Sequence, residues 1–372
     1  MACLWITSDR PGAECHAAWM DRAEGWSNEV LLREYVGFRA EHIEALRSTL
    51  LLGRQDHFRG RRLSKLRRAA FTTVDGEVTP ADTLILMACA IDAHADGVPV
   101  FAHLTAAAIW GLPTIGKAPE LVEYKASAGS HGRAPQARRR RTSVPAAEIL
   151  IGGLSVTTCE RTIVDHARHA SLESALAMCD NAIRAGITTR QSLLEELDTV
   201  PKGARGKRMA ALAIHLADAR AESVLESLSR ARMFQLSLPC PQLQTEFRDA
   251  NGFVGRVDFY WPELGAVGEA DGMTKYAVPE GGSGEEAVNV LLREKQRELR
   301  LRRHRSVNEL VRWGWDDAMS PGHLFNVLTG CGIRPVLDGG WPVPPGPLPP
   351  TAFLERRRCA LSPSGGQTRR AE

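Results

Sequence analysis

The amino-acid sequence predicts a mixed α/β (α+β) protein with several domains. The chain has 372 residues, more than one ordinary domain holds, and its hydrophobic content of 44% is typical of a globular protein. Helical periodicity alternates with short runs of β-branched and aromatic residues. Residues 1–27 show no clean period, so we expect a poorly ordered extension there, followed by three folded segments and a tail.

The first folded segment is predicted over residues 28–80. Apolar residues recur at three- and four-residue steps between Ser27 and Leu52, which indicates a helix. Residues 53–68 then hold seven Lys or Arg against one Asp and lead into a strand-like run, Phe71–Val74. This order favours a winged helix-turn-helix-like module, although a basic amphipathic helix at a domain edge is the alternative. The residues expected to contact DNA are Arg61, Arg62, Lys65, Arg67 and Arg68.

The second segment, residues 81–200, is predicted to be a mixed α/β region. Pro80–Ala95 is an apolar helix, and residues 103–110 form a helix of small residues that ends at Gly111 and Pro113. A strand is expected over residues 121–127, with further helices beyond it. His103 begins the second helix, where a structural cap is the usual role and catalysis the alternative.

The third segment, residues 208–318, follows a Gly- and Lys-rich link and contains a predicted β-hairpin. Its strands are Val254–Tyr260 and Ala266–Asp271, joined by a turn at residues 262–265. Symmetry about the turn pairs Asp258 with Glu269. Side chains alternate faces along a strand, so Asp271 shares the face of Glu269.

Like charges directly opposite each other destabilise a sheet, and a divalent cation reverses that effect. Mg²⁺ and Mn²⁺ prefer oxygen ligands. The hairpin therefore predicts a Mg (or Mn) site, while separately hydrated acids or a one-residue register slip remain the alternatives. A helix around Glu222 adds that residue to the metal ligands Asp258 and Glu269, unless its polar face serves only a Glu226–Arg230 pair.

The segment from residue 221 to about 317 resembles a known superfamily. An acid on a helix, an aspartate, a hairpin with the sequence E-x-D and a basic helix are the order of the PD-(D/E)xK restriction-endonuclease-like superfamily. More narrowly, the chain resembles actinobacterial proteins with DUF559-like or AbiEi-antitoxin-like domains. The segments that carry this resemblance are Arg68–Phe71, Phe101–Pro113, Glu160–Asp165, Ala221–Ser223, Arg256–Phe259, Gly268–Gly272, Glu294–Glu298 and Val311–Trp313. The sequence departs from the pattern at Ala270, Leu299 and Arg303–Arg305.

The resemblance implies an AbiEi-antitoxin-like domain over residues 81–200 and an αβββαβ nuclease-like domain over residues 208–318. One expectation is a DNA-binding protein with a metal-dependent endonuclease-like site. Its catalytic residues are Asp258, Glu269, Asp271, Lys275 and Lys295, and Arg297 contacts DNA. The other is an antitoxin-type regulator of a type IV toxin–antitoxin system, in which the C-terminal domain is catalytically silent and the partners are DNA and a cognate toxin.

Composition argues against a membrane protein, a secreted protein and a zinc-binding protein. No apolar run approaches the roughly 20 residues of a membrane span, and the N-terminus lacks a signal-peptide pattern, so we expect a soluble, cytoplasmic protein without a membrane partner. The eight cysteines show no zinc-like spacing, which favours reduced and mostly buried thiols. Residues 335–372 are Pro-rich at their start and are predicted to be a disordered tail.

Overall fold

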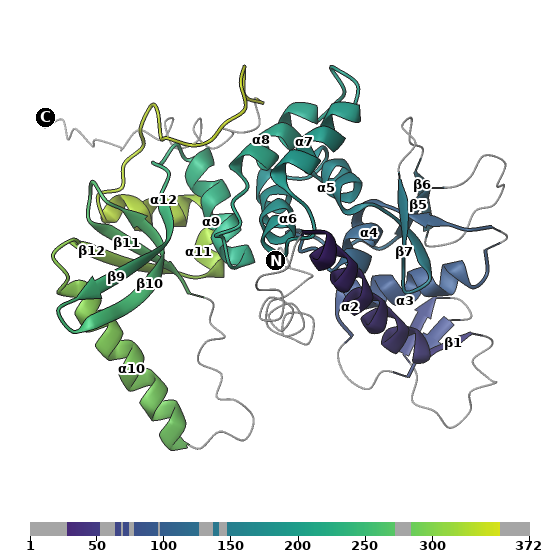
Figure 1. The fold of residues 1–372 in the computed structure, drawn as a ribbon, viewed down its shortest axis with the longest axis horizontal. Coiled ribbons are helices and arrows are strands. Elements are labelled where there is room, and N and C mark those ends of the chain that lie inside the picture. Colours follow the sequence, from purple (N-terminus) through teal and green to yellow (C-terminus); the bar gives the residue numbers. More distant parts are fainter. Residues whose placement is uncertain are drawn as a thin grey trace, which may run out of the picture. The chain divides into compact units, whose positions relative to one another are not determined.

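The chain divides into two compact units in the computed structural model, unit 1 over residues 1–224 and unit 2 over residues 225–372 (Figure 1). The described residues are 28–52, 64–67, 70–73, 78–95, 97–125, 137–140, 147–271 and 284–349. Within these ranges, none of the helices is long and apolar enough to cross a membrane. The boundary between the units lies C-terminal to the predicted link at residues 201–207. The segments predicted over residues 28–80 and 81–200 both belong to unit 1.

Unit 1 begins with a helix and a small sheet of order β1-β3-β2. Their bounds are α2 Asn28–Ser48, β1 Leu50–Leu52, β2 Ser64–Arg67 and β3 Ala70–Thr72. The predicted helix reaches Leu52, but the observed one ends earlier because Thr49 turns the chain: its Oγ1 donates to the Leu46 carbonyl at 2.7 Å and lies 2.9 Å from Thr72 Oγ1. A strand, β3, overlaps the predicted strand-like run Phe71–Val74, and Lys65 lies on the neighbouring strand β2, paired with Phe71.

A five-stranded sheet of order β6-β5-β4-β8-β7 and six helices complete unit 1 within its described residues. The strands are β4 Val100–Phe101, β5 Val122–Lys125, β6 Ala137–Arg140, β7 Glu148–Ile151 and β8 Leu154–Thr157. The helices are α3 Pro80–Asp92, α4 His103–Trp110, α5 Cys159–Ala167, α6 Leu172–Arg184, α7 Arg190–Thr199 and α8 Lys207–Leu216. Helix α4 ends before Gly111, as the sequence predicts, and Gly111 forms a left-handed cap with a φ of 72°.

Helix α2 is joined to α4 by buried side chains. Arg39, 6% exposed, donates from Nε to the Ile109 carbonyl at 3.0 Å and from Nη2 to the Ala108 carbonyl at 3.0 Å. Tyr35 donates its hydroxyl to the Trp110 carbonyl at 2.9 Å. These carbonyls lie in the last turn of α4, where the Ala108 carbonyl also accepts from the Gly111 N–H at 3.0 Å. The predicted N-terminal module and middle domain therefore share one core.

The elements of unit 2 begin in the order αβββαβ, the order that the family resemblance implies for this part of the chain. Its elements are α9 Val224–Gln235, β9 Gln242–Asp249, β10 Gly252–Trp261, β11 Ala266–Ala270, α10 Gly284–Arg302, β12 Glu309–Trp313, α11 Trp315–Met319 and α12 Pro321–Gly330. The sheet order is β12-β11-β10-β9. The pairs β9–β10 and β10–β11 are antiparallel, and α10 crosses over to make β12 parallel to β11. The coarse prediction of a mixed α/β protein is confirmed.

Two boundaries in unit 2 differ from the sequence prediction. Helix α9 begins at Val224, so Glu222 lies before the helix and not on its polar face. The first part of the predicted disordered tail, residues 335–349, is ordered. Trp341 packs edge-on against Phe234 at 5.7 Å between ring centroids and donates Nε1 to the Leu238 carbonyl at 2.9 Å. A buried aromatic contact of this kind offsets the entropy of ordering the Pro-rich segment.

Candidate functional site

The hairpin of β10 and β11 sets the geometry of the candidate site. Its strands pair Phe259 with Gly268 and Trp261 with Ala266. Continuing this register by one step sets Asp258 opposite Glu269, the pairing that the turn symmetry predicts. Gly265 closes the turn with a φ of 58°, which favours glycine.

Asp258 is bound to the backbone of the opposite strand. Its Oδ2 accepts a hydrogen bond from the Ala270 N–H at 2.9 Å. A carboxylate that accepts from a backbone amide gains a charge-assisted bond and loses one lone pair for other ligands. Asp258 therefore fixes the end of β11 as well as lying opposite Glu269.

Glu269 is buried, with 7% of its surface exposed, and both of its oxygens bind arginine. Oε1 accepts from Arg297 Nη2 at 2.6 Å, and Oε2 accepts from Arg312 Nε at 2.8 Å. The two arginines also share Glu294, with Arg297 Nη1 and Arg312 Nη2 at 2.9 Å and 2.8 Å from its Oε1. These four residues, Glu269, Glu294, Arg297 and Arg312, form what we term the arginine–glutamate cluster.

The cluster holds its arginines firmly in the charged state. Burial lowers the pKa of Arg297, but the charge of Glu269 and the hydrogen bond to it outweigh burial and raise that pKa. The same balance raises the pKa of Arg312, where burial opposes the charges of Glu269 and Glu294. Both arginines therefore stay charged and paired with Glu269 and Glu294.

The other predicted catalytic residues lie in different surroundings. Asp271 follows β11 directly and donates its backbone N–H to the Trp313 carbonyl at 2.9 Å. Lys295 is exposed on α10 and is not part of the cluster, although Glu294 and Arg297 on the same helix are. Lys275 lies outside the described residues. The structure therefore brings together Asp258, Glu269 and Arg297, and leaves Lys295 at the surface.

The predicted helix-borne ligand is placed differently from the expectation. The Glu222 carbonyl accepts a hydrogen bond from Arg184 Nη1. The acid that the α9 helix does carry is Glu226, which is 4% exposed and accepts from Gln244 Nε2 at 2.9 Å. Helical spacing alone did not show which glutamate of the pair faces the sheet.

The residues present do not fit a Mg²⁺ or Mn²⁺ ion held by Glu269. Both of its oxygens already bind guanidinium groups, which would lie within a few ångströms of the ion and repel it. Among the described residues, no group of three or more His, Cys, Asp or Glu side chains has a metal-binding arrangement. Arg297 and Arg312 are thus the partners of Glu269 among the described residues.

Sequence reasoning missed Arg312 as a member of the site. Arg312 pairs with Glu269 in the register of the parallel strands β11 and β12. The signal was present as the acid-rich and Arg-rich pattern Glu294–Glu298 followed by the strand Val311–Trp313. Nothing local in the sequence sets the register of a parallel pair joined by a helix, so the partner of Glu269 was not apparent.

The predicted DNA-contacting residues are only partly described. Lys65 is exposed on β2, and Arg67 lies on the same strand. Arg61, Arg62 and Arg68 lie outside the described residues. Arg297 is directed into the cluster and donates to the Arg256 carbonyl at 2.8 Å, so its charge is already paired inside the protein.

Comparison with known proteins gives a limited result. The chain is 33% identical over 129 residues to two uncharacterized proteins of Mycobacterium tuberculosis, MT2308 of strain CDC 1551 / Oshkosh and Rv2248 of strain ATCC 25618 / H37Rv. The match covers 35% of this chain and 47% of each relative, so it spans about half the length of the relatives. No protein-family model matches the chain, and no solved structure matches it.

Proposed function

We propose that this protein is a DNA-binding regulator of the AbiEi-antitoxin kind, in which unit 2 keeps a restriction-endonuclease-like fold without its catalysis. The observation that carries the proposal is the pairing of both Glu269 oxygens with Arg297 and Arg312. Two guanidinium groups neutralise the acid that a nuclease of this fold uses to hold its metal. The αβββαβ order supports the fold, and the fold supports more than one function.

Basic residues, among them the exposed Lys65, support the DNA-binding part of the proposal. Lys65 and Arg67 lie on β2, within the small sheet that follows a helix, as in a winged module. Side chains of this kind bind phosphates and fix the register of a protein on the duplex. Arg293, Lys295 and Arg303 are exposed on or directly after α10 and offer a second basic surface in unit 2.

A cognate toxin is the protein partner in this proposal. Unit 2 then serves as an interaction module whose surface contacts the toxin. A neighbouring reading frame for a nucleotidyltransferase-like toxin would support the assignment.

A metal-dependent nuclease is the second candidate function. Two observations favour it: Asp258 lies opposite Glu269 in the hairpin register, and the element order is that of the nuclease superfamily. Against it stands the pairing of both Glu269 oxygens with Arg297 and Arg312, which does not fit a divalent ion on Glu269. The two functions differ in whether the protein binds Mg²⁺ or Mn²⁺ at all.

DNA binding is tested with the full chain by fluorescence anisotropy on duplexes from upstream of its own gene, between about 50 and 200 mM salt. We expect affinity to fall steeply with salt, because Lys and Arg displace counterions from phosphates. Replacing Lys65 and Arg67 by Gln should reduce the salt slope by about 1 per lost phosphate contact. Lys202→Gln, an exposed lysine elsewhere in unit 1, is the matched control. Binding unchanged by the double replacement would reject the role of β2.

Catalysis is tested on the same preparation with supercoiled and linear DNA in Mg²⁺ or Mn²⁺. The regulator predicts no cleavage and no heat of metal binding by calorimetry. Divalent-dependent cleavage that disappears in both Asp258→Asn and Glu269→Gln would establish the nuclease instead.

A further inference from the structure

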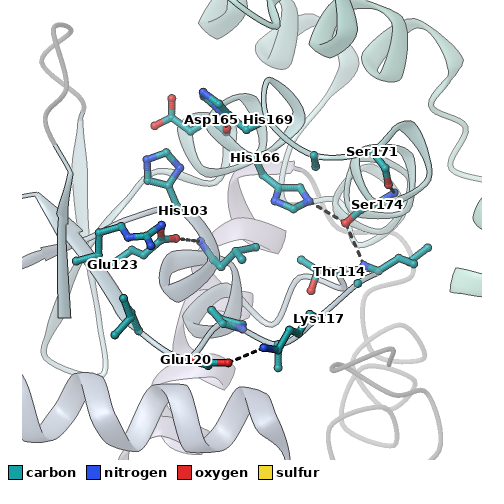
Figure 2. Close-up of a pocket in the computed structure, with 18 residues that line it drawn as sticks. His103, Thr114, Lys117, Glu120, Glu123, Asp165, His166, His169, Ser171 and Ser174 are labelled. Carbon is teal, nitrogen blue, oxygen red and sulfur yellow. Dashed lines mark hydrogen bonds and ion pairs between the residues drawn. The ribbon is translucent and has the colours of Figure 1, made fainter. Parts of the chain in front are cut away.

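A cavity of about 720 Å³ lies in unit 1 (Figure 2). Its walls come from the starts of α4 and α6, the end of α5, strands β5 and β6, and the loop that follows α4. Figure 2 shows His103 and Glu123 on one side and Ser171 and Ser174 on the opposite side. Small-molecule sites in proteins measure roughly 300 to 1,000 Å³, so this cavity is large enough for one ligand.

The charged side chains at the wall face charges of the opposite sign. Three acids among the described residues line the cavity, and each lies beside a base. The pairs are Glu120 with Lys117 Nζ at 2.6 Å, Asp165 with Arg161 Nε at 2.9 Å, and Glu123 with Arg138, which lies opposite it in the register of β5 and β6. A charged ligand would bring a charge that these paired groups do not balance, and burying an unbalanced charge is costly. The wall therefore favours an uncharged ligand.

Much of the remaining wall is apolar. The side chains that form this part are Leu104, Ile115, Ala118, Pro119, Leu121 and Ala170. Removing apolar surface from water is favourable, so walls of this kind suit a ligand with a hydrophobic body. The rings of His103 and His169 add an edge-on aromatic pair at 6.3 Å between centroids.

His166 offers a hydrogen-bond donor at the wall. Ser174 Oγ accepts from the Ile115 N–H at 3.0 Å and lies 2.9 Å from His166 Nε2. Ser174 is 2% exposed, and Nε2 is the one acceptor for its hydroxyl proton within the described part of the chain, so the hydroxyl donates to Nε2.

The other ring nitrogen of His166 then carries the proton. Burial, together with the nearby imidazoles of His103 and His169, lowers the pKa of His166 to about 4, so its ring is neutral at pH 7. A neutral imidazole that accepts at Nε2 has its N–H at Nδ1. His166 is partly exposed and lines the cavity, so a ligand there can accept from this N–H.

Thr114 offers a second polar group at the same wall. Its side chain lies near Ser174 and Lys117 in Figure 2. Thr114 is 1% exposed, and its hydroxyl has no hydrogen-bond partner among the residues that the structure describes. A buried hydroxyl without a partner destabilises the free protein, and an acceptor atom on a ligand would remove that cost. Thr114 and His166 together favour a ligand that accepts hydrogen bonds.

We propose that this cavity binds an uncharged carbonyl compound, with an apolar body against Ile115 and Ala170 and the carbonyl oxygen as acceptor for Thr114 and His166. An amide or a ketone meets both conditions, because its oxygen has two lone pairs and no net charge. A carboxylate supplies the same acceptor but adds a charge that the wall does not balance. This inference rests on unit 1 alone and holds whether or not the proposed function does.

The probe for the test is N-phenyl-1-naphthylamine, an uncharged dye whose fluorescence rises in apolar sites, titrated into the full-length protein. The titration is made at pH 8, above the ordinary imidazole pKa of about 6.5. We expect saturable binding of the dye and its displacement by 2-naphthamide. The anion 2-naphthoate and the cation 2-naphthamidine share its ring and shape, and each should compete at least tenfold more weakly.

Thr114→Val tests the acceptor contact, because valine has the shape of threonine without the hydroxyl. The variant should bind 2-naphthamide about fivefold or more weakly, the effect of losing one hydrogen bond. It should also raise the midpoint of urea unfolding of the free protein, since it removes an unpaired buried hydroxyl.

Thr157→Val is the matched control for Thr114→Val. Thr157 is also buried, but its hydroxyl lies 2.8 Å from Thr162 Oγ1 and it does not line the cavity. Its replacement should lower the unfolding midpoint and leave the affinity for 2-naphthamide unchanged. Opposite changes in stability from the same substitution separate the unpaired hydroxyl from an ordinary buried one.

A second pair of variants locates the site. Ala170→Trp should fill the cavity and abolish binding, with far-UV circular dichroism showing that the fold is kept. Ala95→Trp places the same side chain at an exposed position of unit 1 outside the cavity and should bind as the wild type does.

Three results would overturn the inference. One is competition by 2-naphthoate or 2-naphthamidine as strong as that by 2-naphthamide. Another is a Thr114→Val variant with the wild-type affinity for 2-naphthamide. The third is the absence of saturable 2-naphthamide binding below about 1 mM, the weak limit of specific association.

Discussion

Arg312 lies directly opposite Glu269 in the parallel pair of β12 and β11 and donates from Nε to Oε2 at 2.8 Å. The Glu269 side chain is 10% exposed and that of Arg312 is 25% exposed, so water screens this pair only in part. The bond joins the crossover strand to the hairpin. Its loss should therefore affect the folding of unit 2 as well as any chemistry at the site.

Glu269→Gln should lower the free energy of unfolding. The replacement leaves two arginines that have lost a buried counter-charge, which costs about 1–3 kcal/mol when the partners keep other contacts. Glu246→Gln is the control, because its pair with Arg248 is exposed on both sides and is worth less than about 0.5 kcal/mol. Urea unfolding of the full chain measures both, and equal midpoints for the two variants would show that the cluster adds no stability.

Gly268→Ala should be strongly destabilising. A Cβ at this position would lie 2.7 Å from Trp313 Cη2 and 3.2 Å from Trp261 Cζ3. Trp313 cannot move freely, because its Nε1 donates to Ser229 Oγ at 2.8 Å and its ring stacks on Phe259. Overpacking of this kind costs about 1–3 kcal/mol.

Near-UV circular dichroism and urea unfolding check the Gly268 prediction. Gly322→Ala is the matched control, since a Cβ there meets nothing within 4 Å and the residue lies in α12. Alanine in a helix is favoured over glycine by about 1 kcal/mol, so this variant should be as stable as the wild type or more so. A Gly268→Ala protein with an unchanged near-UV spectrum and midpoint would contradict the close approach of the tryptophans.

The stability of unit 1 should fall as the pH is lowered from 7 to 5. Burial lowers the pKa of His166 from 6.5 to about 4, so between these values the unfolded chain binds a proton that the folded one does not. The stability that the protein gains by keeping His166 neutral is fully present above the pKa of the unfolded chain. It is lost as the pH falls toward the pKa of the folded protein. By pH 5 the free energy of unfolding should have fallen by about 2 kcal/mol.

Urea unfolding at pH 7 and pH 5 measures the effect of His166. His166→Gln keeps a hydrogen-bonding group beside Ser174 but cannot titrate, so its stability should depend less on pH over this range. An identical pH dependence in the variant and the wild type would remove His166 as the cause.

The described cysteines should differ in reactivity. All five are thiols outside any disulfide, and Cys89, Cys159 and Cys179 are buried whereas Cys240 and Cys331 are partly exposed. Burial raises the pKa of Cys159 and Cys179, and the thiolate is the reactive form. Iodoacetamide followed by peptide mass mapping should label Cys240 and Cys331 well before these two. Early labelling of Cys179 would show that α6 opens readily.

The features that depend on neighbours in sequence were predictable. The register that sets Asp258 opposite Glu269 follows from a short turn and the alternation of side chains, and both are local properties. The end of α4 at Gly111 follows from the freedom of glycine to adopt a positive φ. Binary pattern and turn residues thus predicted the hairpin of β10 and β11, whereas the full αβββαβ order of unit 2 was implied only by the family resemblance.

The features that depend on distant partners were not predictable. The pairing of Glu269 with Arg312 depends on the register of a parallel crossover, which no turn fixes. Lys65 and Arg67 lie on a strand because β2 pairs with β3, although their basic run suggested a helix. The cavity beside His103 collects residues from several separate elements, and sequence spacing carries no sign of their meeting.

The hydrogen bonds from Arg39 and Tyr35 to the last carbonyls of α4 limit where this chain can be truncated. A shortened chain that starts near Pro80 would remove the side-chain donors of the Ile109 and Trp110 carbonyls and open the core beside Trp110. A fragment that ends near Pro80 would contain Arg39 without the α4 carbonyls that accept its hydrogen bonds. A cut near Pro80 would therefore destabilise both fragments. Roles for the N-terminal region should be assigned by single substitutions in the intact chain.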